Sequence, residues 1–162
     1  MDLRLSKRGD YVVRSAICLA RAYPSPRPTK LREISAEMGV PRTYVSQILG
    51  DLVRAAVATS SAGVHGGYRL ARHPADISLL EVIEAAEGSL APDAGCTRER
   101  GTARWSVVCP LHDTWVRATR ALRAEFAATT LADLAACDRP AARAWPPPPI
   151  HVSEAASVIA VG

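Results

Sequence analysis

Two cysteines and a histidine in the middle of the chain are of residue types that bind metals. Twelve residues separate Cys96 from Cys109, and His112 follows the second cysteine by three positions. Thiolate and imidazole groups are ligands of zinc and of iron–sulfur clusters. The spacing is too loose to select one chemistry. A cluster, a zinc ion, a regulatory disulfide between the two cysteines and the absence of any metal all remain open.

The composition describes a chain that can bury a core and that has no segment suited to a membrane. The sequence has 162 residues, of which 48% are hydrophobic. No apolar run approaches the roughly 20 residues of a membrane span, and "MDLRLSKRGD" lacks the apolar centre of a signal peptide. We therefore expect the protein in the cytoplasm, where thiols stay reduced. Four cysteines there favour metal binding or redox chemistry over structural disulfides.

Charge is distributed unevenly between the two halves of the chain. Residues 1–75 hold 12 Lys and Arg against 5 Asp and Glu, a balance of +7. Residues 76–162 hold 8 against 11, a balance of −3. A basic first half indicates a polyanionic partner such as nucleic acid, whereas the plainer interpretation is a solvated basic face.

The first half has the pattern of a helix-turn-helix. A first helix is predicted over 10–23, with Cys18 inside its apolar pattern as a packed thiol. "TKLREISAEMGVPRTYVSQILGDLVRAA" then predicts two helices. Gly39 suits the turn between them, and Pro41 suits the first turn of the second helix. The buried face of that second helix is predicted to comprise Val45, Ile48, Leu49 and Leu52.

A wing and two further helices are predicted to follow. Strands at 57–60 and 68–71, joined by a loop containing Gly63, Gly66 and Gly67, predict a hairpin. A capped helix is expected over 76–88, and one long amphipathic helix runs from "CPLHDTW" through "TTLADLAA". The exposed apolar stripe of that long helix needs a partner, for which a second copy of the chain is the natural candidate.

The fold class is therefore mainly α, a winged helix-turn-helix with a small β-hairpin wing and a long C-terminal dimerisation helix. We expect a DNA-binding domain over 1–75, a sensor loop and dimerisation helix over 76–136, and a disordered tail over 137–162, where four consecutive prolines occur.

Five motifs resemble those of the Rrf-two family of winged-helix regulators, of the IscR, NsrR and RsrR type. They are "YVSQIL", "GGYRLAR", "ISLLEVIEAAEG", "CPLHDTW" and "TTLADL", which occur in the order and spacing of the family across about residues 3 to 135. The resemblance implies a homodimeric transcription factor, and many members hold an iron–sulfur cluster near the dimerisation helix. It implies no enzymatic activity, and the sequence has no nucleophile–base pair that would favour the rival interpretation, a small metalloenzyme or electron carrier.

In this fold the second helix of the helix-turn-helix enters the major groove of a roughly palindromic promoter site. That geometry assigns the base-reading positions to Arg42, Thr43, Tyr44, Ser46 and Gln47. A second set is expected at backbone phosphates or the minor groove, namely Lys7, Arg8, Ser60, Ser61 and His65. Many relatives have a glutamate at the position of Ser46 and an arginine at that of Ala62, so their preferred DNA sequence does not transfer to this chain.

The resemblance also implies a set of cluster ligands. Cys96 matches the first and Cys109 the last of three cysteines that cluster-binding members carry, and the middle one is missing here. His112 occupies a position where some relatives use a histidine, and Asp10 one where others supply a carboxylate from the partner subunit. These four groups suit a [2Fe–2S] cluster, with [4Fe–4S], zinc or no metal as alternatives. The function expected is a regulator whose promoter affinity responds to redox state, nitric oxide or iron–sulfur status; a cluster-free regulator controlled by thiol oxidation or a protein partner is the alternative.

Overall fold

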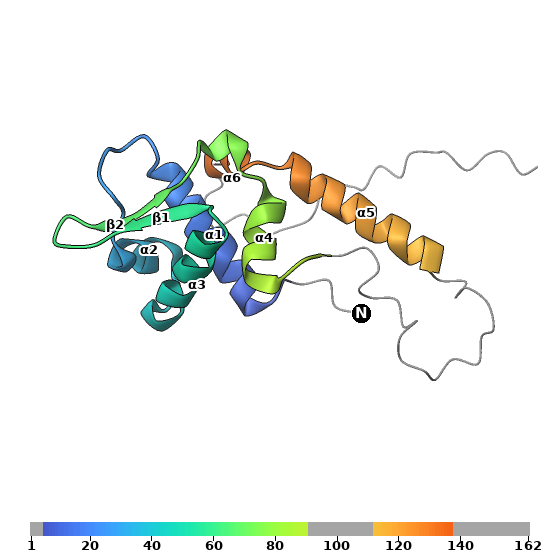
Figure 1. Ribbon diagram of the computed structural model, residues 1–162, viewed down its shortest axis with the longest axis horizontal. Coiled ribbons are helices and arrows are strands. Elements are labelled where there is room, and N and C mark those ends of the chain that lie inside the picture. Colours follow the sequence, from blue (N-terminus) through green and yellow to red (C-terminus); the bar gives the residue numbers. More distant parts are fainter. Residues whose placement is uncertain (1–4, 91–111, 138–162) are drawn as a thin grey trace, which may run out of the picture.

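The computed structural model describes residues 5–90 and 112–137, which form a mainly helical body with a projecting helix (Figure 1). The elements are, in chain order, α1 (Lys7–Arg21), α2 (Leu31–Met38), α3 (Arg42–Arg54), β1 (Ala58–Ser61), β2 (Gly67–Leu70), the short 3-10 helix η1 (Pro74–Asp76), α4 (Leu79–Glu87), α5 (His112–Ala128) and α6 (Leu131–Ala136). Helices with a single two-stranded hairpin among the described elements confirm the predicted fold class.

The helix-turn-helix consists of α2 and α3, joined at Gly39. This glycine has φ 64°, a left-handed conformation that a side chain would strain. Pro41 is the N-cap of α3, where its missing N–H leaves no hydrogen bond unmade. The apolar face of α3 is buried as its spacing predicts, with exposed fractions of at most 1% at Val45, Ile48, Leu49 and Leu52. Burying this face fixes which side of α3 points outward.

The wing is an antiparallel hairpin in which Ala58 pairs with Leu70 and Ser61 with Gly67. Its loop folds back closely on itself, since a Cβ on Gly66 would lie 2.1 Å from the carbonyl oxygen of Ser61. Thr29 pairs with β2 near the loop end of the wing, where its backbone N–H donates to the Tyr68 carbonyl and its carbonyl accepts from the Tyr68 N–H, both at 2.9 Å. This contact joins the loop before α2 to the wing and holds the hairpin in place.

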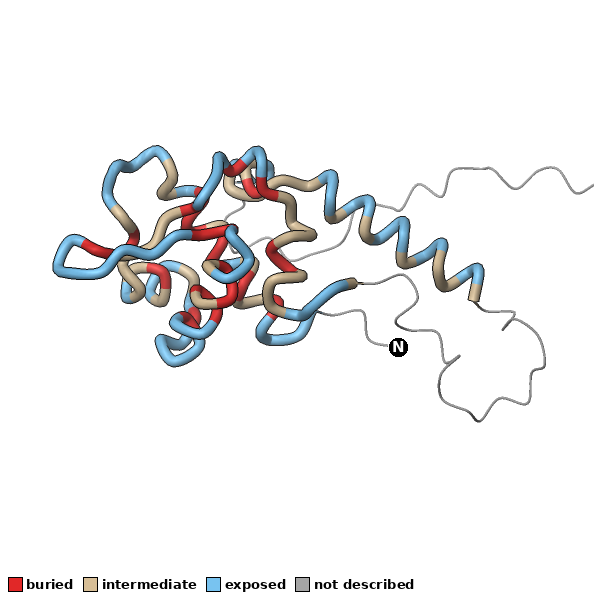
Figure 2. Tube along the Cα trace, viewed as in Figure 1, coloured by how far each residue is buried: buried red, intermediate tan, exposed pale blue. Residues whose placement is uncertain are grey.

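The hydrophobic core extends beyond the helix-turn-helix. Val12, Ala16 and Leu19 of α1 belong to one buried cluster with Val82 of α4 and Leu131 of α6 (Figure 2). The helices that follow the sequence boundary at residue 75 thus complete the core of the winged helix. Ser78 caps α4 with Glu81 in the predicted capping box, and Gly88 ends the helix.

The prediction of one long helix up to residue 136 is wrong, because the chain turns at Thr129 and Thr130. The Thr130 hydroxyl accepts a hydrogen bond from the N–H of Asp133 at 3.2 Å, and the Asp133 carboxylate accepts one from the N–H of Thr130 at 2.9 Å. This second capping box starts α6, whose first residue, Leu131, is fully buried. Burial of Leu131 and a new helix start together outweigh continuation of α5.

Helix α5 projects from the body as an arm (Figures 1 and 2). None of its residues is buried, and Leu122 is 38% exposed. Arg123 anchors the arm to the body by bonding Glu84 of α4 and the backbone carbonyl of Leu90. Across the described residues, no helix combines the length and the apolar character that crossing a membrane requires.

Candidate DNA interface and sensor residues

The N-terminal half of α3 presents a row of exposed side chains. Every predicted base-reading residue is exposed, and the buried residues Val45 and Ile48 alternate with them along the helix, as a 3.6-residue period requires. The exposed set is Arg42, Thr43, Tyr44, Ser46 and Gln47. It offers a guanidinium, two hydroxyls, a phenol and an amide, which are groups that hydrogen-bond to base edges in the major groove.

The wing extends the candidate interface at the same end of the molecule. Ser60, Ser61 and His65 are all exposed, as their predicted role requires. Two neighbours of these residues were not predicted from the sequence. Val64 at the loop is 88% exposed, and the ammonium group of Lys30 donates a hydrogen bond to the carbonyl of Val64. A lysine directly before the first helix of the helix-turn-helix is the signal that could have found this contact.

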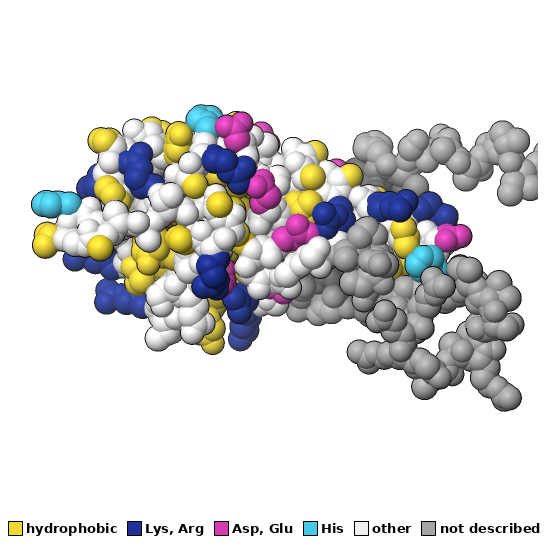
Figure 3. Space-filling view, in the orientation of Figure 1, with side chains coloured by type: hydrophobic (Ala, Val, Ile, Leu, Met, Phe, Trp, Pro, Cys, Tyr) yellow, Lys and Arg dark blue, Asp and Glu magenta, His cyan; other side chains and the backbone are white. Residues whose placement is uncertain are grey.

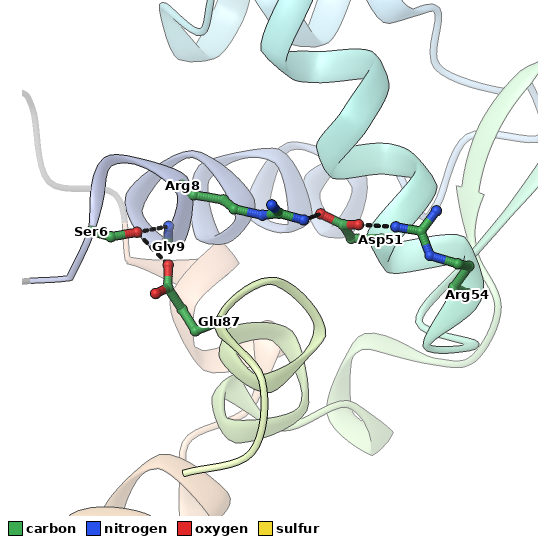
Figure 4. Close-up of polar contacts among 6 residues, drawn as sticks. All are labelled: Ser6, Arg8, Gly9, Asp51, Arg54 and Glu87. Carbon is green, nitrogen blue, oxygen red and sulfur yellow. Dashed lines mark hydrogen bonds and ion pairs between the residues drawn. The ribbon is translucent and has the colours of Figure 1, made fainter. Parts of the chain in front are cut away.

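The first turn of α1 carries Lys7 and Arg8, both exposed. Arg8 is nevertheless engaged within the protein, because its guanidinium pairs with the carboxylate of Asp51 on α3 (Figure 4). Asp51 also pairs with Arg54, and its side chain is only 3% exposed. The long-range pair between Arg8 and Asp51, which the sequence pattern gave no sign of, leaves Lys7 as the cation of this turn without an ion-pair partner among the described residues.

Basic side chains lie over the winged helix-turn-helix and also along the arm α5 in the face shown, and acidic ones lie mostly in between, toward α4 (Figure 3). The net positive charge of residues 1–75 therefore falls on the winged helix-turn-helix itself. A positive surface around an exposed recognition helix attracts a phosphate backbone and makes binding depend on salt.

The predicted cluster ligands are described only in part. Asp10 lies in the first turn of α1 with its side chain 43% exposed, and the Nε of Arg14 lies 3.0 Å from its carboxylate. His112 begins α5, and its Nδ1 is buried without a hydrogen-bond partner in the described part of the chain. Cys96 and Cys109 lie outside the described residues. Within 5–90 and 112–137, no three His, Cys, Asp or Glu side chains gather as a metal site.

Cys18 is a packed core thiol, as predicted. Burial, followed by a 3.3 Å hydrogen bond from its Sγ to the carboxylate of Glu37, raises the pKa of the Cys18 thiol to about 12. The thiolate is the form that binds metals and reacts with oxidants. Because the raised pKa keeps Cys18 protonated at neutral pH, we expect it neither to bind a metal nor to react with oxidants. Cys137, at the end of α6, is exposed.

An exposed helix placed by a helix-turn-helix, with a wing beside it, defines a winged-helix DNA-binding protein. Residues 5–137 match the Rrf2 family, described as an iron-dependent transcriptional regulator, and the chain belongs to this family. It is the Rrf-two family that the sequence motifs resemble. The chain is 30% identical over 132 residues to "Protein rrf2" of Nitratidesulfovibrio vulgaris, a match that covers 82% of this chain and 87% of the relative. The protein is thus a transcriptional regulator and not an enzyme.

Two solved structures share the fold. CymR, the global cysteine regulator of B. subtilis, has a TM-score of 0.68 at 27% identity, covering 83% of this chain and 97% of CymR. IscR of T. potens has a TM-score of 0.67 at 26% identity, covering 83% of this chain and 87% of IscR.

Proposed function

We propose that this protein is a homodimeric regulator that binds a roughly palindromic promoter site and whose affinity is set by an iron–sulfur cluster, most simply [2Fe–2S]. The observation that carries the DNA-binding part is the exposed row of hydrogen-bonding side chains on α3. The family match supports regulation of transcription, and its description as iron-dependent supports a sensor that contains iron.

The unburied arm α5 supports the dimer. Trp115, Leu122 and Phe126 lie on a helix that has no buried residue, and an apolar stripe of this kind is stabilised by packing against another helix. A second α5 supplies a matching stripe by symmetry. Two copies then present two recognition helices, so each half of the promoter site meets the same residues.

The proposed ligands are Cys96, Cys109 and His112 of one subunit with Asp10 of the other. The buried Nδ1 of His112, which lacks a partner among the described residues, fits a nitrogen ligand because a buried polar atom without a hydrogen bond is costly. The half-exposed carboxylate of Asp10 fits a ligand offered across an interface. A bound cluster supplies one-electron chemistry and sensitivity to oxidants and nitric oxide, and oxygen or nitrogen ligands raise its potential.

The chain would couple the state of the cluster to DNA binding through the position of its helices. Asp10 lies on α1, which packs against the recognition helix α3, while His112 begins the arm. Holding or releasing the Asp10 carboxylate shifts the population of dimers whose recognition helices have the correct spacing for DNA.

Anaerobic purification followed by iron, acid-labile sulfide and visible-absorption measurements tests the cluster. Coloured protein with iron and sulfide in stoichiometric amounts is expected. Cys96→Ala, Cys109→Ala, His112→Ala and Asp10→Ala should each change the spectrum or the loading, and a residue whose replacement leaves both unchanged is no ligand. Colourless, iron-free protein would refute the proposed cluster but would not bear on the proposal that the protein binds DNA.

A cluster-free regulator is the second candidate, and the structural similarity to CymR, a regulator of cysteine, favours it. In that case thiol oxidation or a protein partner controls promoter affinity. A disulfide between Cys96 and Cys109 would then be detected by mass spectrometry of oxidised protein. The two candidates differ in one measurable quantity, the iron content of protein that binds its promoter site.

A further inference from the structure

The N-terminal part of α1 contacts the recognition helix at two separate points. Arg8 pairs with Asp51 in the C-terminal half of α3, and the ring of Tyr11 packs edge-on against Tyr44 near the N-terminus of α3, with centroids 5.7 Å apart. Arg8 and Tyr11 are three residues apart and so lie on one face of α1, whereas Tyr44 and Asp51 are two helical turns apart. Two contacts at this separation restrain the angle between the helices as well as their distance.

Asp51 is an unusual residue to find at this position. Its side chain is 3% exposed, and a buried carboxylate is costly unless it is paired and hydrogen-bonded. The guanidinium of Arg8 reaches it from α1 and that of Arg54 from one turn further along α3 (Figure 4). The pair with Arg54 joins two residues of one helix, so only the pair with Arg8 connects two helices.

The first turn of α1 is also fixed on its other side. The Ser6 hydroxyl, which caps α1 by accepting from the Gly9 N–H at 3.1 Å, donates to the carboxylate of Glu87 on α4 (Figure 4). A Cβ on Gly9 would lie 2.9 Å from the Glu87 Oε1, so the Glu87 carboxylate lies directly against the backbone of α1 here. The first turn of α1 is therefore held between α4 and the recognition helix.

We propose that Arg8 and Tyr11 are positioning residues for DNA recognition, which act through Asp51 and Tyr44 to set the orientation of α3 on the body. Arg8 then serves operator specificity through Asp51 and not by contact with a phosphate. The inference rests on the DNA-binding part of the proposed function and is independent of any cluster.

Asp51→Asn should have opposite effects on DNA binding in the two possible roles of Arg8, contact with a phosphate and positioning of α3. If Arg8 contacts phosphate, removing the Asp51 charge frees two guanidinium groups and strengthens binding to every duplex. If Arg8 positions α3, the same substitution weakens binding to the specific site while non-specific binding stays equal or rises. The ratio of the two affinities separates these outcomes.

The probes are a duplex that the wild-type protein selects from a random-sequence pool and a scrambled duplex of the same composition. Fluorescence anisotropy at several salt concentrations gives both affinities for each variant. We expect Asp51→Asn and Arg8→Gln each to lower the specific-to-scrambled ratio by about five- to tenfold, and the double variant to lower it no further than one of them. Arg8→Lys should retain part of the ratio.

Arg54→Gln is the matched control. Like Arg8→Gln, it removes one positive charge that pairs with Asp51, but it breaks no contact between helices. It should lower the affinities for the selected and the scrambled duplex equally, so that their ratio stays that of wild type. Tyr11→Ala should lower the ratio and Tyr11→Phe should keep it, because the ring makes the contact. Circular dichroism and thermal melts identify folded variants, and the Arg8 and Arg54 variants suffice if Asp51→Asn does not fold.

Equal ratios for Arg8→Gln and Arg54→Gln would overturn the proposal, as would parallel strengthening of both affinities by Asp51→Asn. If the wild-type protein selects no duplex at all, the proposed function fails and this inference fails with it. Selection by wild type with unchanged ratios in the variants removes only the positioning role.

Discussion

The DNA-reading end and the arm of this molecule contrast in how their surfaces are supported. In α3 the exposed Arg42 and Gln47 stand on a helix whose opposite face is fully buried at Leu49 and Leu52. In α5 no residue is buried, although Leu122 belongs to an apolar stripe. The reading end is thus supported by a core within one chain, whereas no described residue buries the stripe of the arm. Sequence-specific contacts need side chains held by a buried core, as on α3. An apolar stripe such as that of α5 suits assembly with another helix.

The largest expected effect comes from removing a buried residue of the reading end. Leu49→Ala should lower the free energy of unfolding by about 2–5 kcal/mol, because it leaves a cavity beneath the recognition helix. Chemical denaturation monitored by circular dichroism measures this loss. It should be the same at every protein concentration if the reading end is complete within one chain. A loss that varies with concentration would show that the stability of the reading end depends on a second chain.

Leu122→Asp should weaken dimer formation and leave the fold of each chain intact. A charge on the stripe of α5 should shift the protein from dimer to monomer in analytical ultracentrifugation. Secondary structure should stay unchanged, since the residue is not part of the core. Arg120→Ala, on the same helix and also exposed, is the control. A dimer that survives Leu122→Asp would place the interface elsewhere.

Single changes on the exposed face of α3 should weaken operator binding without changing stability. Arg42→Ala and Gln47→Ala are each expected to cost about 1–3 kcal/mol in affinity for the selected duplex. Melting temperatures should remain within a degree or two of wild type, because surface substitutions rarely alter stability by more than about 0.5 kcal/mol. Anisotropy titrations and thermal melts on the same samples test both statements. Unchanged affinity for both variants would exclude α3 as the reading helix.

A substitution at the N-terminus of α4, the helix that Arg123 of the arm contacts, should have a smaller effect on stability. Ser78→Ala removes the cap of α4 and should cost about 1 kcal/mol in stability. At Glu81, burial opposes ionisation, but hydrogen bonds from Ser78 and Arg72 outweigh it and lower the pKa of the carboxyl. A carboxyl with a lowered pKa contributes stability above its ordinary pKa, and this is lost as the pH falls through the lowered value. The difference between wild type and Ser78→Ala should therefore shrink in acid, which melts across a pH series measure.

The smallest effect concerns Cys18, whose raised pKa of about 12 predicts an unreactive thiol. Relative to its ordinary value of 9.0, the thiolate fraction at neutral pH falls by about a thousandfold. Alkylation of native protein followed by peptide mass spectrometry should leave Cys18 unmodified and modify Cys137, which is exposed. Full labelling of Cys18 before unfolding would contradict the burial on which this prediction rests.

The sequence predicted the reading end well because its structure follows from local patterns. The period that buries Val45 and Ile48 also exposes Arg42 and Gln47, and Gly39 marks the turn. The break at Thr130 was missed since the apolar spacing of α5 runs past it, although Thr130 and Asp133 form a capping-box pattern that could have shown it. The pair of Arg8 with Asp51 joins residues 43 positions apart, and no local pattern reports such a contact.

The sensor residues remain predictions for a related physical reason. Cys96 and Cys109 lie outside the described residues, and Asp10 is proposed to act on the other subunit. A ligand set drawn from separate segments and two chains leaves no periodic trace in one sequence. For two of the four, the structure shows the environment: Asp10 is partly exposed beside Arg14, and the Nδ1 of His112 is buried without a hydrogen-bond partner among the described residues.

The most direct test of the central claim is a comparison of promoter-site affinity between cluster-loaded and cluster-free protein. Both forms come from one anaerobic preparation, the second after removal of iron by a chelator, and both are titrated with the selected duplex under the same salt conditions. If a cluster controls DNA binding, the two affinities should differ by at least about tenfold, since a smaller shift would hardly change promoter occupancy. Equal affinities in protein shown to contain iron and sulfide would contradict control of DNA binding by a cluster.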